Sequence, residues 1–541
     1  MTTYLPFAPI SAVVRPWILW AVLTLFAIGL APAQALAMDW IPILRTDSLA
    51  PGAPGRTING IDTGRSPSSA PPLIDENGRL IFLAWIDGAP AGEHTGRLYQ
   101  WTAEEGLSLH PPAPLSMLEA GCEFGVNGFA VAQNGAYALH ARSVGEHFVC
   151  ESGALLIPDG SEGWSELLPT PEPAISSTWR IGGAGPLGIN QHSEVLVETS
   201  ERYVCPPDSI CAATPRDVLY FADPSGATLI YRETSPAPGV AGDARLGPLV
   251  YKYGIAGPND LGQVVVAVPV YVDGKSIQVL YRWDPDSGLE LIALQGDAVP
   301  GIPNAVFEFL GAPVLDNTGA ITFWGRLENG AEVGPCNDDA LFTRSPAGIT
   351  ELRFRETATS GSIVLPPLVN EVGGLALVTD GRRPDRMSVC GDFTRRLWGP
   401  DGDGNLAVRA RQGDPLPDST RTLLTFDALH LDDAGRLLFW RNSWNTYYMV
   451  DEQGALSVLL NGIEPIQLAP DVSAIPTWAH LAFDRNLEHF ALGVWTQDHA
   501  TGEKASTMLI PVPEPSAMQS GLAALAVLGL LAVRSAGAVR S

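Results

Sequence analysis

The chain has 541 residues, of which 46% are hydrophobic and 17% charged, a composition that excludes an intrinsically disordered protein. Its formal net charge is −26 and its pI is about 4.6. A field of that sign repels phosphate backbones and argues against nucleic-acid binding.

The first predicted element is an export signal over residues 1–37. Arg15 precedes an apolar run from Trp17 to Leu30, and small residues in A-x-A spacing follow up to Ala37. This order of charge, apolar run and small residues is that of a secretory signal peptide. We expect cleavage after Ala37, with Ala35 as the second choice. A retained N-terminal anchor helix is the alternative, and the body is exported in either case.

The body, residues 38–511, carries a repeat. In each copy an apolar pair is followed by Asp or Asn, two or three further residues, Gly, and an alternating apolar strand. Asn or Asp with Gly between apolar runs is the strongest local signal for a hairpin, because these residues tolerate positive φ. Eight copies occur, two of them without the Gly, at Leu73–Phe82, Val131–Tyr137, Ile189–Val195, Pro258–Val264, Leu315–Ile321, Val369–Leu375, Leu431–Leu437 and Phe483–Phe490.

A second hairpin follows the first in each repeat. Leu98–Trp101 turns into Leu107–Leu109, for example, and Leu280–Trp283 turns into Leu289–Ile292. Two hairpins give four antiparallel strands, and so small a sheet cannot bury its faces alone. The sequence therefore predicts an all-β protein, a β-propeller of eight four-stranded blades, with seven blades as the fallback.

The two ends of the body predict how the last blade is completed. The eighth repeat stops after a third strand at Thr507–Ile510, whereas the mature chain begins with a surplus strand at Ile41–Thr46. The segment from Ile41 to Gly52 also resembles the end of other repeats, such as Leu229–Gly239. We expect the N-terminal strand to pair in the last blade and so to remove an exposed edge.

Six cysteines in an exported chain predict three disulfides. If the strands of a blade are lettered A to D from axis to rim, the B–C and D–A loops share one face, and all six cysteines fall there. We predict the pairs Cys122–Cys150, Cys205–Cys211 and Cys336–Cys390. A zinc site is the alternative, but no C-x₂-C pair occurs and the compartment is oxidising.

The longer loops lie on the same face, where a rigid scaffold commonly carries a binding site. They cover about residues 110–125, 169–187, 199–217, 234–254 and 379–395. We expect any ligand to bind there.

No pattern in the chain predicts catalysis or a cofactor. There is no G-x-S-x-G elbow, H-E-x-x-H helix or phosphate-binding Gly-rich loop. Asp401, Asp403 and Asn405 have the first ligand spacing of a calcium loop, but no bidentate Glu follows, so a turn is preferred and the metal site stays a weak candidate. The pairs Asp338-Asp339 and Asp432-Asp433 could serve acid–base hydrolysis of glycans, yet we expect them to be solvated turn residues.

The last predicted element is a tail over residues 512–541. Val512, Pro513, Glu514 and Pro515 precede an apolar run that ends at Arg534. The uninterrupted part from Gly521 to Val533 spans only ~20 Å as a helix, short of a ~30 Å hydrocarbon core, and residues from Ala517 bring it near the lower limit. Arg534 would act as a positive stop on the cytoplasmic side.

This three-part tail resembles the PEP-CTERM sorting signal, with Pro513-Glu514-Pro515 as the motif and a short basic end at Arg534 and Arg540. The resemblance implies that an exosortase in the inner membrane of a Gram-negative cell recognises and removes the tail. A plain tail anchor is the alternative. The body also resembles the tandem NxxG-type repeats of bacterial surface proteins, which implies no activity.

Together these patterns predict a monomeric, exported protein of the cell envelope, outer surface or extracellular matrix, or a secreted protein. It would touch the membrane through its C-terminal segment before processing and bind a surface glycan or protein; the resemblance implies an exopolysaccharide or biofilm. The sequence favours a non-catalytic protein. A polysaccharide-active hydrolase or lyase on the same scaffold, marked by an acidic cluster at one channel mouth, and a structural spacer without ligand are the alternatives.

Overall fold

The structure, a computed structural model, describes residues 40–511 with gaps, the longer of which are 62–71, 88–94, 110–122, 145–152, 167–178, 204–214 and 381–393. The predicted signal peptide and the predicted tail lie outside the described residues. The predictions for Ala35, Ala37, Val512, Pro513, Glu514, Pro515 and Arg534 therefore stay predictions. Within the described residues, no helix is long and apolar enough to cross a bilayer.

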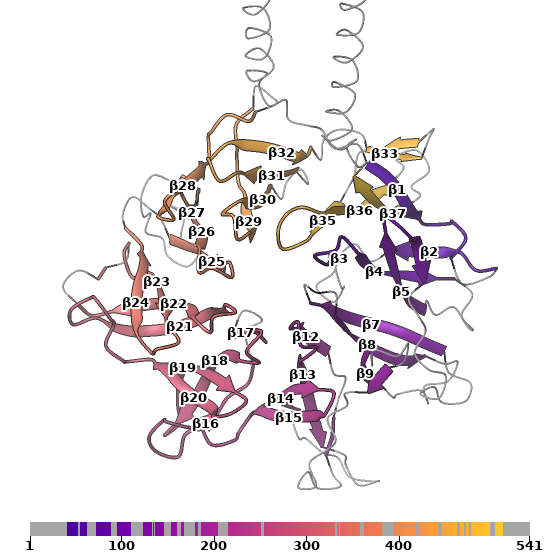
Figure 1. The fold of residues 1–541 in the computed structure, drawn as a ribbon. Helices are drawn as coiled ribbons and strands as arrows, with labels where there is room; N and C mark the ends of the chain where they lie inside the picture. The colour runs from indigo at the N-terminus through magenta and orange to yellow at the C-terminus, as the bar shows by residue number, and fades with distance from the viewer. Residues whose placement is uncertain are drawn as a thin grey trace, which may run out of the picture.

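The described residues form strands and no helix, which confirms the all-β prediction. Eight antiparallel sheets of four or five strands, and one two-stranded sheet, account for the strands. We number the eight larger sheets as blades 1–8 along the chain. Figure 1 shows them arranged in a propeller-like way around a common centre.

Blade 1 contains β2 (Ile58–Ile61), β3 (Leu73–Ile74), β4 (Leu80–Ile86), β5 (Thr95–Thr102) and β6 (Gly106–Leu109), and blade 2 contains β7 (Glu123–Val131), β8 (Tyr137–Val144), β9 (Gly153–Pro158) and β10 (Trp164–Glu166). Blade 3 contains β11 (Trp179–Ile181), β12 (Gly185–Ile189), β13 (Val195–Tyr203), β14 (Arg216–Asp223) and β15 (Gly226–Arg232). Blade 4 contains β16 (Arg245–Leu246), β17 (Ile255–Ala256), β18 (Val264–Val272), β19 (Lys275–Asp284) and β20 (Gly288–Leu294). In blades 1, 3 and 4 the A strand is divided into two short strands that pair with the same neighbour.

Blade 5 contains β21 (Val306–Leu315), β22 (Ile321–Glu328), β23 (Asp339–Arg344) and β24 (Thr350–Arg355), and blade 6 contains β25 (Ser362–Val369), β26 (Leu375–Asp380), β27 (Arg396–Pro400) and β28 (Leu406–Arg411). Blade 7 contains β29 (Asp427–Leu431), β30 (Leu437–Arg441), β31 (Thr446–Val450) and β32 (Leu456–Leu460). Blade 8 contains β35 (Trp478–Phe483), β36 (Phe490–Gln497), β37 (Lys504–Pro511) and β1 (Trp40–Arg45). The two-stranded sheet is β33 (Ile466–Ala469) with β34 (Val472–Ala474).

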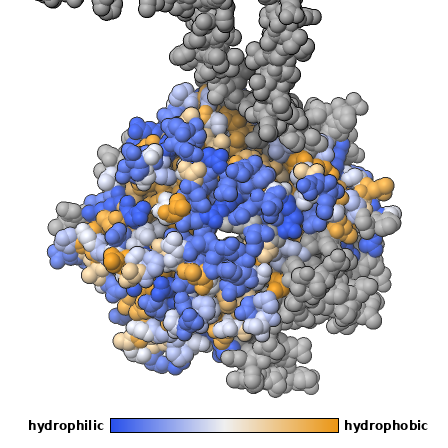
Figure 2. Space-filling view, viewed as in Figure 1, coloured by the Kyte–Doolittle hydropathy of each residue, from blue (hydrophilic) through white to orange (hydrophobic). Residues whose placement is uncertain are grey.

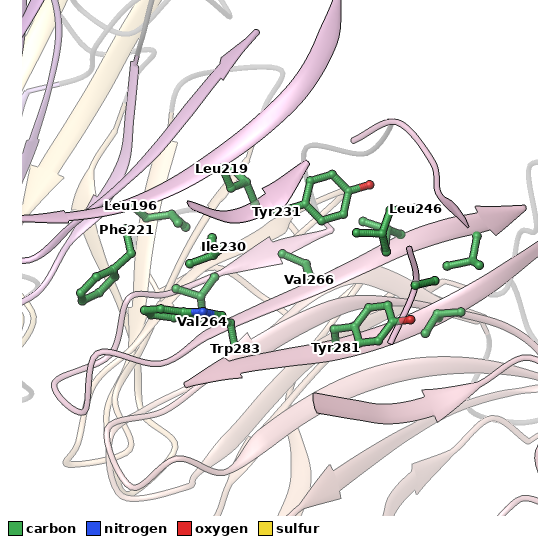
Figure 3. Close-up of a cluster of buried hydrophobic side chains, with 14 of the residues drawn as sticks. Leu196, Leu219, Phe221, Ile230, Tyr231, Leu246, Val264, Val266, Tyr281 and Trp283 are labelled. Atoms are coloured by element: carbon green, nitrogen blue, oxygen red, sulfur yellow. The ribbon is translucent and has the colours of Figure 1, made fainter. Parts of the chain in front are cut away.

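The hydrophobic core lies between neighbouring blades. Strand β18 shows why, because its residues 264–268 and 270 are buried on both sides of the strand. Val264 and Val266 pack with blade 3, including Phe221, whereas Val265 packs with blade 5. Figure 3 shows the first of these clusters, in which the rings of Phe221 and Trp283 lie 4.9 Å apart. A strand covered on both faces needs a nearly continuous apolar run, and Val264–Val272 supplies one.

The first and last strands of the body pair in blade 8, as predicted. Strand β1 runs antiparallel to β37, with Ile41 opposite Ile510 and Arg45 opposite Thr507. The buried hydroxyl of Thr46 donates to the carbonyl of Ser506 at 2.9 Å. Blades 1 and 8 are also neighbours at the centre, where β3 contacts β35.

The corner that follows β1 repeats the corner that follows the D strand of other blades. The amide of Asp47 donates to the carbonyl of Ile58, and the amide of Ile58 donates to the carbonyl of Ser48. After blade 3, the amide of Thr234 donates to Leu246 and that of Leu246 to Ser235 in the same arrangement. Strand β1 is therefore equivalent to a D strand, although it lies at the other end of the chain.

Candidate functional site

The A–B turns of the repeat lie around the centre of the molecule, on the face that also carries the C–D turns. We call this face the turn face and number the residues of each turn from position 1, which is Asp or Asn in seven blades and Ala132 in blade 2. The side chain at position 1 fixes the turn by accepting backbone amides. Asn259 Oδ1, for example, accepts the amides of Leu261 and Gln263 at 3.1 and 2.8 Å. Asp and Asn are the residues whose short side chains make this bond.

The position-1 side chains are buried, and this follows from a second role. Where position 1 is Asn, its amide group donates to the position-1 carbonyl of the next blade. Asn190 Nδ2 donates to Asn259 O at 2.7 Å, and Asn259 Nδ2 donates to Asp316 O at 2.9 Å. Asn370 Nδ2 donates to Asp432 O at 2.7 Å. These bonds join blade 3 to 4, 4 to 5 and 6 to 7.

Where position 1 is Asp, it has no proton to donate, and an arginine at position 5 takes over in blade 7. Asp432 Oδ2 binds the guanidinium of Arg436, which in turn donates to the backbone carbonyl of Asn486 in blade 8. Asp75 and Arg79 form the same pair within blade 1, with 3.1 Å between Oδ2 and Nε. A buried carboxylate without such a partner is costly, which explains why arginine accompanies aspartate here.

Position 2 forms a relay around the axis. In four successive blades, the backbone amide at position 2 donates to the position-2 side chain of the following blade. Gln191 N donates to Asp260 Oδ1 at 3.3 Å, and Asp260 N donates to Asn317 Oδ1 at 3.0 Å. Asn317 N donates to Glu371 Oε2 at 3.1 Å, and Glu371 N donates to Asp433 Oδ1 at 3.0 Å. The relay requires an acceptor side chain at each of these positions.

Arg485, at position 2 of blade 8, has no acceptor atom in its side chain. It donates instead to the position-2 carboxylates of the two preceding blades. Its Nη2 lies 2.6 Å from Asp433 Oδ2, and its Nη1 lies 3.5 Å from Glu371 Oε1. Burial lowers the pKa of Arg485, while the charges of Glu76 in blade 1 and Asp260 in blade 4 oppose that shift. Carboxylates from widely separated blades therefore act on one guanidinium at the centre of the ring.

We call this group the axial mouth: Glu76, Gln191, Asp260, Asn317, Glu371, Asp433 and Arg485. It brings acids, carboxamides and one guanidinium together from seven blades. In the view of Figure 2, hydrophilic residues gather around the middle of the molecule. From the sequence, Asp433 is predicted only as part of an acidic pair, and Arg485 is not predicted. The signal for Arg485 is a basic residue at position 2 of a repeat that otherwise places an acceptor there.

His430, on the A strand of blade 7, supports the mouth from within the core. Its Nε2 lies 2.6 Å from the carbonyl oxygen of Arg485, and its ring lies 5.1 Å from that of Phe483. Burial lowers the pKa of His430, so the neutral ring donates from Nε2 at pH 7. Beside it, burial and the charge of Asp432 raise the pKa of Asp433.

The expectation that the two acidic pairs are solvated turn residues is wrong for three of the four side chains. Asp432 is 1% exposed because it binds Arg436, and Asp338 and Asp339 are 4% and 3% exposed. By contrast, Asp401 Oδ1 accepts the amides of Asp403 and Asn405 at 3.0 and 2.8 Å in an exposed C–D turn.

Asp338 and Asp339 form a buried acidic group with Glu356, in which one carboxylate oxygen from each residue lies within 4.8 Å of the others. Three carboxylates at that spacing could hold a hard cation such as Ca²⁺. Other partners are present as well: Arg326 Nε lies 3.7 Å from Asp339 Oδ1, and the hydroxyl of Ser362 donates to Glu356 Oε1 at 2.9 Å. The group is therefore part of a polar network that blade 5 shares with Ser362 of blade 6.

Most of the predicted loop face lies outside the described residues. Cys336 is in a disulfide bond, and the other five cysteines fall in the gaps, so the proposed pairings stay predictions. The described part of the 234–254 loop differs from the expected open binding loop, because Ala237, Ala244 and Leu246 are buried in the core between blades 3 and 4. It is a packed corner.

Comparison with solved structures gives only distant likenesses. An acylaminoacyl peptidase of Pyrococcus horikoshii is 11% identical with a TM-score of 0.35, covering 80% of this chain and 58% of its own. A PL25 ulvan lyase is 9% identical with a TM-score of 0.33, covering 81% and 91%. An α-L-arabinofuranosidase, Arb93A of Fusarium graminearum, is 12% identical with a TM-score of 0.29, covering 61% and 93%. The chain thus spans less than two thirds of the length of the peptidase.

The sequence matches no curated protein. One family model does match, over residues 55–364, which is 310 of the 541 residues. The chain therefore belongs to DUF7453, a family of unknown function.

Proposed function

We propose that the protein is an exported envelope protein whose eight-bladed β-propeller, completed by the N-terminal strand, binds a glycan at the axial mouth. One observation carries this proposal: Arg485 lies among acceptor side chains contributed by different blades, with its Nη2 2.6 Å from Asp433. Carboxylates and carboxamides accept hydrogen bonds from sugar hydroxyls, and a guanidinium donates to them. A ring of both kinds fits a polyhydroxylated ligand.

The carboxylate oxygens of the axial mouth can accept further hydrogen bonds in addition to those that join the blades. Asp433 uses one oxygen for the amide of Glu371 and the other for Arg485, and each carboxylate oxygen can accept two bonds. The backbone amides hold these side chains in fixed positions, so binding a ligand would order few further rotamers. Preorganisation of this kind favours affinity.

A polysaccharide-active enzyme is the second candidate, and the pKa of Asp433 favours it. Hydrolysis of a glycosidic bond needs a carboxyl with a raised pKa as general acid beside a second, ionised carboxylate. Burial raises the pKa of Asp433, and Glu371 approaches the same guanidinium. On this reading Asp433 would be the acid and Glu371 the base.

The proposal includes the route to the surface. The signal peptide would be removed after Ala37, three disulfides would form outside the cytoplasm, and an exosortase would recognise Pro513-Glu514-Pro515. Glu514→Gln should then leave an uncleaved precursor in the membrane fraction. Unchanged processing in this variant would remove the sorting role of the motif.

A glycan array, read for binding and for released sugar, tests the function with the full chain in detergent. Binding without turnover that falls about tenfold in Arg485→Gln, equivalent to the loss of one charged hydrogen bond, supports the leading proposal. Arg421→Gln is the matched control, because Arg421 is exposed at a D–A corner on the opposite face. Turnover lost in Asp433→Asn would establish the enzyme, and no signal with any glycan would favour a spacer.

A further inference from the structure

Asp260 is a charged side chain of the axial mouth that is held by neutral groups. Its Oδ1 accepts the backbone amide of Gln191 at 3.3 Å, and its Oδ2 accepts the side-chain amides of Gln191 and Asn317. Among the described residues, no lysine or arginine forms an ion pair with this half-buried carboxylate. The bonds therefore fix Asp260 without neutralising its charge, and Oδ1 can accept one further hydrogen bond.

The neighbouring carboxylates of the mouth show that this ring accepts an organic cation. Asp433 Oδ2 and Glu371 Oε1 lie 2.6 and 3.5 Å from the guanidinium nitrogens of Arg485. The charge of Asp260 also acts on this guanidinium, but without an ion pair between them. Asp260 thus has the same position in its turn as Glu371 and Asp433, and the described residues offer it no cation.

Other positive side chains on the turn face are already bound within their own turns. Arg79 and Arg436, at position 5 of two A–B turns, pair with the position-1 aspartates. Two of the three lysines of the chain, Lys275 and Lys504, begin C strands, which places them on the opposite face. The four carboxylates of the axial mouth are opposed by one guanidinium, so three negative charges remain in excess there.

The spacing of these carboxylates favours an organic cation over a metal ion. Within the described parts of the chain, Asp338, Asp339 and Glu356 form the one group of three acids whose oxygens lie within 4.8 Å of one another, and the acids of the mouth form no such group. An ion such as Ca²⁺ requires several oxygens around one centre. The mouth suits positive charges that are distributed along a chain and carry their own hydrogen-bond donors.

We propose that the axial mouth selects a glycan with free amino groups, and that Asp260 is the residue that determines this specificity. This rests on the proposed function, the binding of a glycan at the same mouth. A protonated amine supplies the cation that Asp260 has not found among the described residues, together with donors for charge-assisted hydrogen bonds. Acetylation of the amine removes the charge, and an acidic sugar is repelled by the excess negative charge of the mouth.

Two oligosaccharides that differ only in acetylation test the specificity. Calorimetric titration of the full chain in detergent compares a glucosamine hexamer with an N-acetylglucosamine hexamer at about pH 6, where the amines are protonated. The amino hexamer should bind about tenfold more tightly, as expected for one charge-assisted hydrogen bond, and this difference should shrink at high salt. An oligogalacturonate should bind more weakly than either hexamer.

Asp260→Asn should abolish the preference by weakening the amino hexamer about tenfold while changing the affinity for the acetylated one less than about twofold. The substitution suits the turn, because Asn317 holds position 2 in blade 5 and accepts the amide of Asp260 with its side chain. Asp286→Asn is the matched control, since it removes the same charge from an exposed C–D turn of the same blade and face, and it should keep the preference.

Equal affinities for the two hexamers, or a preference that survives in Asp260→Asn, would overturn this specificity and leave glycan binding at the mouth intact. Tighter binding of the oligogalacturonate would do the same. Binding of an oligolysine peptide but of neither hexamer would overturn it in favour of a basic protein partner. If no glycan binds at all, the proposed function itself fails, so the two failures are distinguishable.

Discussion

At position 2 of blade 8, Arg485 stands where the other described A–B turns have an acceptor side chain. Its side chain donates to the preceding blades, whereas the position-2 amides of blades 3–6 donate to the following blade. Its guanidinium lies between Glu371 and Asp433, which would otherwise face each other as two carboxylates at the centre of the ring. The residue therefore has a structural role that is independent of any ligand, and this role can be measured separately.

Arg485→Gln should destabilise the protein by about 1–3 kcal/mol, because two carboxylates lose a charged hydrogen-bond donor and repel each other. The midpoint of urea unfolding measures the effect. Arg421→Gln, exposed on the opposite face, should change the free energy of unfolding by less than about 0.5 kcal/mol. Equal midpoints for the two variants would show that the ion pairs of Arg485 contribute nothing to stability.

His480, on the A strand of blade 8, should make stability fall in mild acid. Burial lowers its pKa to about 4, below the 6.5 of an unperturbed histidine. Between pH 6.5 and pH 4, His480 is therefore protonated in the unfolded chain and neutral in the folded chain. Its contribution to the free energy of unfolding, complete above pH 6.5, is lost as the pH falls towards 4. Between pH 7 and pH 5 the loss from this group is about 2 kcal/mol.

Melting temperatures at pH 7 and pH 5 test the assignment to His480. The drop between them should be smaller in His480→Gln than in the unchanged protein. His192→Gln is the control, because His192 is exposed in an A–B turn. A drop that is the same in both variants would assign the acid sensitivity to other groups.

At the scale of the turn, an Arg at position 5 accompanies Asp at position 1 in blades 1 and 7, whereas Asp316 in blade 5 has Ala320 there. Asn259 donates to the next blade itself, whereas Asp432 depends on Arg436 to do so. Asn259→Asp should therefore cost about 2–4 kcal/mol, because it removes a buried donor and adds a buried charge.

Adding Gln263→Arg to Asn259→Asp should restore part of that loss, since the pair then matches Asp432 and Arg436. Urea unfolding of the two single variants and the double variant gives the coupling energy. A double variant as unstable as the sum of the single ones would contradict the link between positions 1 and 5.

The sequence could place the turns, because their signal is local. Asp or Asn with Gly at fixed spacing located the A–B turns of blades 1, 4, 5, 6 and 7, and the apolar runs around them located the variant turns of blades 2, 3 and 8 and the strands that follow. It could not predict the relay, since Gln191 and Asp260 are 69 residues apart and neither residue carries a special pattern. It also missed the burial of Asp338 and Asp339, which depends on partners brought together only by folding.

For the whole molecule, the pairing of β1 with β37 predicts that the N-terminal strand is essential to blade 8. Leu44, in β1, is 5% exposed and packs with Ile58 and Met508. Leu44→Asp should cost more than about 3 kcal/mol, because it removes a core side chain and buries a charge. It should also free the edge of β37 for pairing with other molecules.

Thermal unfolding and light scattering measure these two effects. Leu49→Asp is the matched control, since Leu49 is 73% exposed in the corner directly after β1. If Leu44→Asp melts like the control and stays monomeric, the N-terminal strand is dispensable.

The sequence predicted the end-to-end pairing because the corner after β1 resembles in sequence the corner after other D strands. It did not predict that both ends of the body lie on the same face, because strand direction within blade 8 had to be combined with the register of Trp40 and Pro511. The sequence shows which segments are equivalent repeats, whereas the face on which each chain end lies depends on strand directions that only the folded structure gives.

The adjacency of Trp40 and Pro511 has a consequence for the order of the blades. A turn of about four residues, like Asp451–Gly454 in blade 7, could join these two positions, and new ends could be opened at another C–D turn. A circularly permuted body should then keep its blades in the same cyclic order. Moving the ends to blade 4 would also carry any membrane tether to the opposite side of the ring.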